Sequence, residues 1–181
     1  MSTAAPATAA VSPAITGPAR PQPIVTAPQR GLRVVRIAGP AWVWFVGCHG
    51  GSGESTLAGL LPNSMATDHR WPVYPDGMSA PVVLLARTSA AGLLAARTAL
   101  IQWAAGDTPA VQLLGLVLSA DAPGRLPKPL RDLAHQVGGG APRVWHLPWV
   151  EEWRTGDLAG PKLVAPLFAD LATLTTPQED S

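Results

Sequence analysis

Apolar residues in this chain gather into short continuous runs separated by longer segments of helical spacing. The continuous runs, each of a length typical of a buried strand, cover residues 41–47, 81–87, 111–120 and 143–149. Segments with apolar positions at helical spacing cover residues 55–61, 88–106, 126–137 and 160–174. Strands that alternate with helices in this way form βαβ units. We therefore expect a three-layer α/β fold with a mostly parallel sheet and helices on both faces.

The regular pattern is missing at both ends of the chain and in one internal interval. Residues 1–30 are rich in Ala, Pro and Thr without any helix or strand period, which predicts a disordered tail. We assign residues 31–176 to a single α/β domain and residues 177–181 to a flexible C-terminus. Turn residues dominate at 63–80, which we interpret as a long loop with room for one irregular strand.

Composition narrows the class of protein without naming a function. Of the 181 residues, 47% are apolar and 14% are charged, and the net charge is +1. This balance excludes a disordered acidic chain and a strongly basic nucleic-acid binder, so no nucleic-acid partner is expected. The single cysteine cannot form an internal disulfide. The sequence shows neither a signal-peptide pattern nor an apolar run long enough to span a bilayer, so we expect a cytoplasmic protein with no membrane association.

The turn after the first strand-like run has the layout of a phosphate-binding loop. Residues 44–62, WFVGCHGGSGESTLAGLLP, pass from a strand through Gly50, Gly51 and Gly53 into a helix. Glycines let consecutive backbone N–H groups converge on an anion in front of a helix N-terminus. Such a loop also requires a lysine for the outer phosphates and a Ser or Thr for magnesium. The alternative is a tight turn whose glycines only permit a positive φ.

Two positions depart from the phosphate-loop pattern. Ser55 stands at the magnesium position, but Glu54 occupies the lysine position and Cys48 the first glycine. A glutamate close to a triphosphate repels it, so nucleotide affinity should be weak unless another cation is recruited. Arg87, at the end of the run 81–87 and on the same edge of the sheet, is the candidate for that cation.

At this point a family resemblance is visible. The segment GCHGGSGESTLAGLLP resembles the deviant phosphate loop KGGxGK[ST]T of the MinD/ParA class of P-loop ATPases. His49 falls on the signature lysine, Glu54 on the loop lysine, and Ser55 and Thr56 on the two hydroxyl residues. The segments PVVLLARTSAAGLLAAR, LLGLVLSAD and RVWHLPWVEEWRTGD follow in the family's order, so the resemblance covers about residues 41–175. The HGGxG, WP, ADAPGRLP and LPWVE segments are also similar to those of short, uncharacterised actinobacterial proteins.

The resemblance implies a site for ATP or ADP with magnesium, in which Ser55 is the metal ligand. It places the base near residues 119–121 and 148–149, where Trp149 could stack on it and Asp121 could accept from an exocyclic amine. Packing at the domain edge and capping of a turn are the alternative roles of these two residues. The expected binding residues are Gly50, Gly51, Ser52, Gly53, Glu54, Ser55, Thr56, Arg87, Asp121, Pro148 and Trp149.

The departures from the family decide the functional interpretation. The family places an activating and a magnesium-binding aspartate in the interval that is only residues 63–80 here, where Asp68 and Asp76 are the carboxylates. With both lysines replaced, hydrolysis lacks its electrostatic components. We expect a pseudo-ATPase: a degenerate module that binds a nucleotide or phosphate weakly or no longer, and acts through a protein partner. A homodimer is an open question, because the family's dimer depends on the signature lysine, here His49.

Two alternative functions stay open, and the cysteine and the histidines are two further candidate features. The first alternative is an active ATPase with a substitute cation. The second is a non-catalytic interaction protein in which the glycine-rich loop is structural and loops bearing Trp71, Trp149 and Trp153 bind a partner. Cys48 could be a reactive thiol beside a helix N-terminus, or a small residue filling a turn. The four histidines show no spacing typical of a zinc site.

Overall fold

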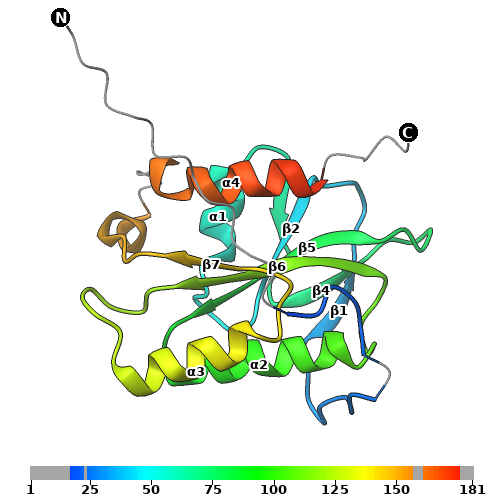
Figure 1. Ribbon diagram of the computed structural model, residues 1–181. Coiled ribbons are helices and arrows are strands. Elements are labelled where there is room, and N and C mark those ends of the chain that lie inside the picture. The colour runs from blue at the N-terminus through cyan, green and yellow to red at the C-terminus, as the bar shows by residue number, and fades with distance from the viewer. Residues whose placement is uncertain (1–16, 23, 157–160, 176–181) are drawn as a thin grey trace, which may run out of the picture.

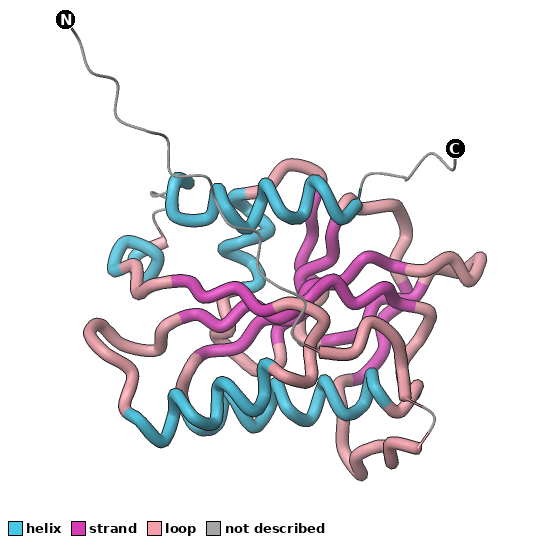
Figure 2. Tube along the Cα trace, in the orientation of Figure 1, coloured by secondary structure: helices cyan, strands magenta, loops and turns pink. Residues whose placement is uncertain are grey.

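A parallel sheet of five strands in the order β3-β2-β5-β6-β7 forms the centre of the protein (Figures 1 and 2). The computed structural model describes residues 17–22, 24–156 and 161–175, so most of the predicted N-terminal tail and residues 177–181 lie outside it. The strands are β2 (Val43–Gly47), β3 (Ser64–Ala66), β5 (Ala80–Arg87), β6 (Val111–Ser119) and β7 (Val144–Leu147). Every pairing in this sheet is parallel, as the apolar pattern predicts.

Helices cover both faces of the sheet and complete three layers. The helices are α1 (Glu54–Leu60), α2 (Ala90–Ala104), α3 (Lys128–Gly138) and α4 (Pro161–Thr175), with a 3₁₀ turn η1 (Glu151–Thr155) after β7. In Figure 1, α2 and α3 lie below the sheet, and α1 and α4 lie above it. The fold class is therefore the three-layer α/β arrangement expected from the sequence.

The side chains of β2 point alternately to the two faces of the sheet and contribute to two separate core clusters. Trp44 and Val46 belong to the cluster that also contains Leu93 of α2, whereas Phe45 belongs to the cluster that contains Leu171 of α4. Successive side chains of a strand point to opposite faces, so a central strand covered on both sides must be apolar throughout. All five residues of β2 are buried, which fits this requirement.

The interval 63–80 contains two short strands rather than a long loop with at most one. β3 pairs with β2 at the edge of the main sheet, and β4 (Arg70–Val73) pairs with β1 (Arg33–Arg36) in a separate two-stranded parallel sheet. Trp71 of β4 is fully buried, so it is not part of an exposed interaction surface. Residues of this interval thus contribute to the core. The turn residues among them interrupt the alternation of apolar and polar positions that would predict a strand.

Gln102 of α2 forms hydrogen bonds that connect the two-stranded sheet of β1 and β4 to α2. Its Oε1 accepts hydrogen bonds from Leu32 N at 2.8 Å and from Trp71 Nε1 at 2.9 Å, and its Nε2 donates to Leu32 O at 3.1 Å. The side chain is buried, so each of these polar groups depends on it for a partner. One glutamine thereby holds the start of β1 and the indole of β4 against α2.

We expect Gln102→Met to lower the free energy of unfolding by about 2 kcal/mol, because it leaves the Leu32 amide and the Trp71 indole N–H without acceptors. Urea denaturation measures the change. Gln136→Met, which replaces an exposed glutamine of α3, is the matched control and should leave the midpoint in place. Equal midpoints for the two variants would contradict this role of Gln102.

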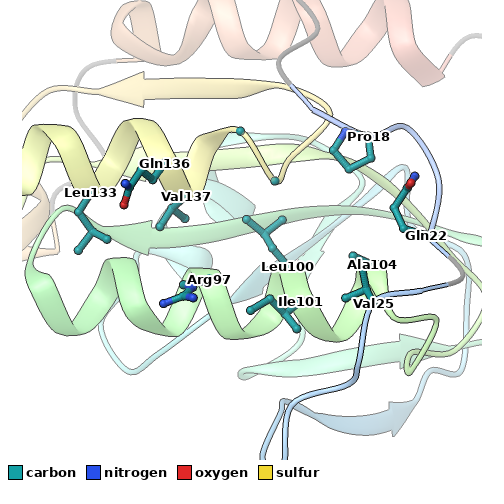
Figure 3. A pocket seen from close by; sticks show the side chains of 12 residues that line it. Pro18, Gln22, Val25, Arg97, Leu100, Ile101, Ala104, Leu133, Gln136 and Val137 are labelled. Atoms are coloured by element: carbon teal, nitrogen blue, oxygen red, sulfur yellow. The ribbon is translucent and has the colours of Figure 1, made fainter.

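Part of the segment interpreted as a disordered tail lies along α2. The amide of Gln22 donates to Ala104 O at 2.7 Å, and Pro18, Gln22 and Val25 line a cavity of about 600 Å³ together with α2 and α3. Figure 3 shows Leu100 of α2 in this lining. Residues 17–22 and 24–30 therefore belong to the described structure, while residues 1–16 of the predicted tail lie outside it.

Candidate functional site

The glycine-rich turn connects the carboxyl end of β2 to α1. Gly51 has φ 74° and Gly53, which precedes the first helical residue, has φ 99°. Only glycine adopts such left-handed conformations without a steric cost, so the path of the chain requires glycine at positions 51 and 53. The turn lies at the carboxyl edge of a parallel sheet, where ligands of such sheets bind.

Glu54, the residue in the lysine position, is turned into the protein. Its side chain is buried, with Oε2 accepting from Gly47 N at 2.6 Å and lying 3.5 Å from His69 N. Oε1 lies 2.9 Å from His69 Nδ1. This corrects the expected placement of the carboxylate beside the phosphates, because its oxygens face β2 and the end of β3 instead.

Gly47 provides the space in which the Glu54 carboxylate sits. A Cβ on Gly47 would lie 2.6 Å from His69 Nδ1 and 3.0 Å from Glu54 Cδ, and closer still to Ser52 Oγ. Contacts this short force neighbours to move, since the adjoining groups are buried. The glycine at the end of β2 is thus as necessary to the turn as those within it.

His49, in the position of the signature lysine, connects the turn to β5 of its own chain. The amide of Arg87 donates to His49 Nε2 at 3.0 Å, which makes that nitrogen an acceptor. Nδ1 then carries the proton and donates to Gly50 O at 2.8 Å. Both ring nitrogens are used within the chain.

Arg87 extends from the end of β5 over the turn. Its Nε donates to Gly51 O at 3.0 Å and its Nη1 donates to Ala120 O at 3.0 Å. Among the described residues, no carboxylate lies within 4.0 Å of this guanidinium. Arg87 thus lies beside the turn, where the sequence predicts a cation. No ion pair in the described structure neutralises its charge.

Arg87 lines a cleft of about 700 Å³ along the carboxyl edge of the sheet. Backbone and side chains from the turn after β2, the end of β5, the loop after β6 and the segment after β7 form its walls. The lining residues are His49, Gly50, Gly51, Arg87, Ser89, Asp121, Ala122, Pro123, Trp149, Glu151 and Arg154. Five of the eleven residues expected at a nucleotide site come together here: Gly50, Gly51, Arg87, Asp121 and Trp149.

The remaining six expected residues do not line the cleft. They are Ser52, Gly53, Glu54, Ser55, Thr56 and Pro148. Ser52 is buried below the turn, whereas Ser55 is exposed in the first turn of α1. The proposed magnesium ligand Ser55 therefore lies outside the walls of the cleft.

Trp149, Glu151 and Arg154 form a small cluster in the lining of the cleft. Trp149 Nε1 donates to Glu151 Oε2 at 2.8 Å, and the Arg154 guanidinium lies 5.7 Å from the centre of the Trp149 ring. Arg154 Nη1 is also 3.5 Å from Glu151 Oε1. Sequence reasoning found Trp149 but missed Arg154, because only the 3₁₀ turn η1 brings a residue five positions later back over the ring.

Cys48 is a buried residue of the turn and not a reactive thiol. Burial raises the pKa of its thiol to about 12; a hydrogen bond with the Leu85 backbone lowers that pKa, and the nearby Glu54 charge raises it. A thiol with a raised pKa holds little of the nucleophilic thiolate at neutral pH. The structure supports the alternative in which Cys48 fills the turn.

We expect the native protein to react with Ellman's reagent at pH 8 only as fast as the turn opens, because the thiol is protonated and covered. The full equivalent should react at once in 6 M guanidinium chloride. A Gly50→Cys variant, with a thiol at an exposed position, is the reactive control. Immediate labelling of the natural protein would contradict the burial of Cys48.

Comparison with known proteins identifies a family but no activity. The model of a family described as "Family of unknown function (DUF6668)" matches residues 41–165, which is more than half of the chain. Neither the curated proteins nor the solved structures contain a match. In the part of the chain that the structure describes, no helix has the length and apolar character needed to cross a membrane.

Proposed function

The chain belongs to the DUF6668 family, whose function is unknown, and we propose that it is a degenerate nucleotide-binding module of the P-loop kind. In this proposal the phosphates of ATP or ADP, with magnesium, lie in the cleft against the turn 48–54. The module hydrolyses little or no nucleotide and acts through a protein partner. The MinD/ParA-like order of the segments and the parallel sheet support this proposal.

The position of Arg87 is the observation that carries the proposal. Its guanidinium is held at the turn by two carbonyl groups, Gly51 O and Ala120 O, and it faces a cleft that is open to solvent. A guanidinium fixed by carbonyl oxygens keeps its full charge and retains further N–H donors for phosphate oxygens. It can thus take the role that the loop lysine has in the resembling family.

The cluster of Trp149, Glu151 and Arg154 suits a nucleobase. Trp149 offers an aromatic surface, Arg154 a second cation and the exposed Asp121 a carboxylate, all within the lining of the cleft. Stacking on an aromatic side chain stabilises a bound base by about 1–3 kcal/mol. An exocyclic amine of the base would donate to Asp121. A cleft lined by both cations and an aromatic ring offers partners for the phosphates and for the base of a nucleotide.

We expect weak or absent hydrolysis because the carboxylates of the cleft are not placed to hold a metal ion and an attacking water. Asp121 and Glu151 are the acidic residues in its lining, and Glu151 is engaged by Trp149 and Arg154. Glu54 is turned inward and Asp68 does not line the cleft. Phosphoryl transfer requires a positioned metal and a positioned water. Of the described carboxylates that line the cleft, Asp121 is the one without an ion pair, and in this proposal it binds the base instead of a metal or water.

A module that binds without turnover must transmit its state through another molecule. The proposed output is a change in how the chain contacts a protein partner when the cleft is filled. Homodimers of the resembling MinD/ParA class rely on the signature lysine, and His49 here is engaged with Gly50 and Arg87 of the same chain. We therefore propose a heterologous partner.

Calorimetric titration of the full chain with ATP, ADP and GTP in the presence of magnesium tests the proposal. Binding with a dissociation constant in the micromolar to millimolar range is expected, corresponding to about 4–8 kcal/mol. A phosphate-release assay on the same samples should show no turnover above the buffer control. Absence of binding by all three nucleotides would overturn the proposal and make the glycine-rich turn purely structural.

A further inference from the structure

Three potential metal ligands from two distant segments meet beside the turn. Glu54 from the start of α1 and Asp68 and His69 from the loop after β3 each bring one ligand atom, and these atoms lie within 4.8 Å of one another. Glu54 is buried, His69 is half-buried and Asp68 is exposed. None of the three lines the nucleotide cleft, so the cluster is a separate feature of the molecule.

The contact between His69 and Glu54 is not a well-formed hydrogen bond. His69 Nδ1 is 2.9 Å from Glu54 Oε1, but a proton on this nitrogen would not point at the oxygen well enough to be donated. The Nδ1 atom is itself buried. His69 Nδ1 and Glu54 Oε1 are both electron-pair donors, and they lie close together without a hydrogen bond between them. This arrangement is typical of two ligands that bind the same cation.

Ser52 provides an independent indication of the same space. Its side chain is 1% exposed, and its hydroxyl has no hydrogen-bond partner. The hydroxyl, His69 Nδ1 and Glu54 Cδ all lie within 3.0 Å of the point where a Cβ on Gly47 would stand. A buried hydroxyl without a partner is costly, and a metal-bound water would satisfy it.

The other carboxylate oxygen is already oriented. Glu54 Oε2 accepts from Gly47 N at 2.6 Å, which leaves Oε1 directed at His69. Carboxylates that bind metals are commonly held by such a hydrogen bond on the second oxygen. The backbone amide therefore provides the support that a metal ligand requires.

We propose that Glu54, Asp68 and His69 bind one zinc ion. Zinc accepts carboxylate oxygen and imidazole nitrogen together, and sites with three protein ligands leave a fourth position for water. Magnesium and calcium prefer oxygen ligands throughout, so a site with an imidazole selects against them. The ion joins the loop after β3 to the first residue of α1 and thus fixes the end of the glycine-rich turn, which leads into α1.

Equilibrium dialysis of the untagged full chain against zinc sulfate, followed by elemental analysis, tests the site. One zinc per chain is expected, and cobalt as a substitute should give visible absorption bands. His69→Ala should lower the zinc affinity by about 100-fold or more, because it removes the nitrogen ligand. Asp68→Asn alters an exposed side chain whose ion pair is with Arg70 at 3.1 Å. Surface pairs of this kind contribute little to stability, so its loss of zinc affinity would not reflect misfolding.

His135→Ala removes an exposed imidazole of α3 and is the matched control, which should keep one zinc per chain. Far-ultraviolet circular dichroism confirms that each variant is folded. The proposal is overturned by the absence of stoichiometric zinc, or by equal affinity in the His69→Ala, Asp68→Asn and His135→Ala variants. The outcome does not depend on nucleotide, since the ion is measured alone.

Discussion

Arg87→Gln is expected to weaken the binding of magnesium ADP by about 30-fold, which corresponds to about 2 kcal/mol. Glutamine keeps a polar group near Gly51 O and Ala120 O, with which Arg87 forms hydrogen bonds, but it removes the positive charge. The loss reflects charge-assisted hydrogen bonds to phosphate, which are about twice as strong as neutral ones. Calorimetric titration of the natural protein and the variant measures the change.

Arg97→Gln is the matched control for this substitution. Arg97 is an exposed arginine of α2 that lines the cavity beside α3 and not the cleft that Arg87 lines. Its removal lowers the net charge by the same amount and should leave the affinity for ADP unchanged. If both variants lose affinity equally, the effect is one of overall charge, and the role assigned to Arg87 is wrong.

Gly47→Ala is expected to lower the free energy of unfolding by about 3 kcal/mol. The added methyl group would lie 2.6 Å from His69 Nδ1 and 3.0 Å from Glu54 Cδ, so the buried carboxylate must move. That movement breaks its hydrogen bond from Gly47 N and leaves polar groups unsatisfied. Urea denaturation followed by circular dichroism measures the loss.

Gly50→Ala is the control within the same turn. A Cβ on Gly50 would have no neighbour within 4 Å, and its φ is not positive, so alanine is accommodated without strain. This variant should unfold within about 0.5 kcal/mol of the natural protein. A similar loss of stability in both variants would show that the turn, and not the space for Glu54, limits stability.

The main sheet was predictable because its central strands have no polar face. Runs such as residues 81–87 and 111–120 are buried on both sides, and only a parallel sheet with two helical layers satisfies them. β3 and β4 were not predictable in the same way. β3 is three residues long at an edge, and β4 contains Pro72, so neither shows a clean alternation.

The candidate site was predictable in location but not in the direction of one side chain. Gly50, Gly51 and Arg87 were expected together because the carboxyl ends of neighbouring parallel strands share one edge. The inward turn of Glu54 depends on His69, fifteen residues away, and on the missing side chain of Gly47. The residues next to Glu54 in the sequence do not indicate that its side chain contacts His69.

The orientation of Glu54 changes how its substitution should be interpreted. Lysine at this position would lose the hydrogen bond from Gly47 N and place an ammonium group against the Gly47 amide and His69. Glu54→Lys is thus expected to disturb the turn instead of creating a phosphate ligand. Arg87, whose charge faces the cleft, is the better position for testing nucleotide binding.

Nuclear magnetic resonance of the ¹⁵N-labelled full chain with and without magnesium ADP tests the central claim most directly. The account predicts shifts confined to the cleft: the amides of Gly50, Gly51 and Asp121, and the indole N–H of Trp149. It also predicts unchanged signals for the residues around the cavity between α2 and α3, such as Leu133. No shifts at saturating ADP, or shifts only around that second cavity, would contradict a nucleotide site at the glycine-rich turn.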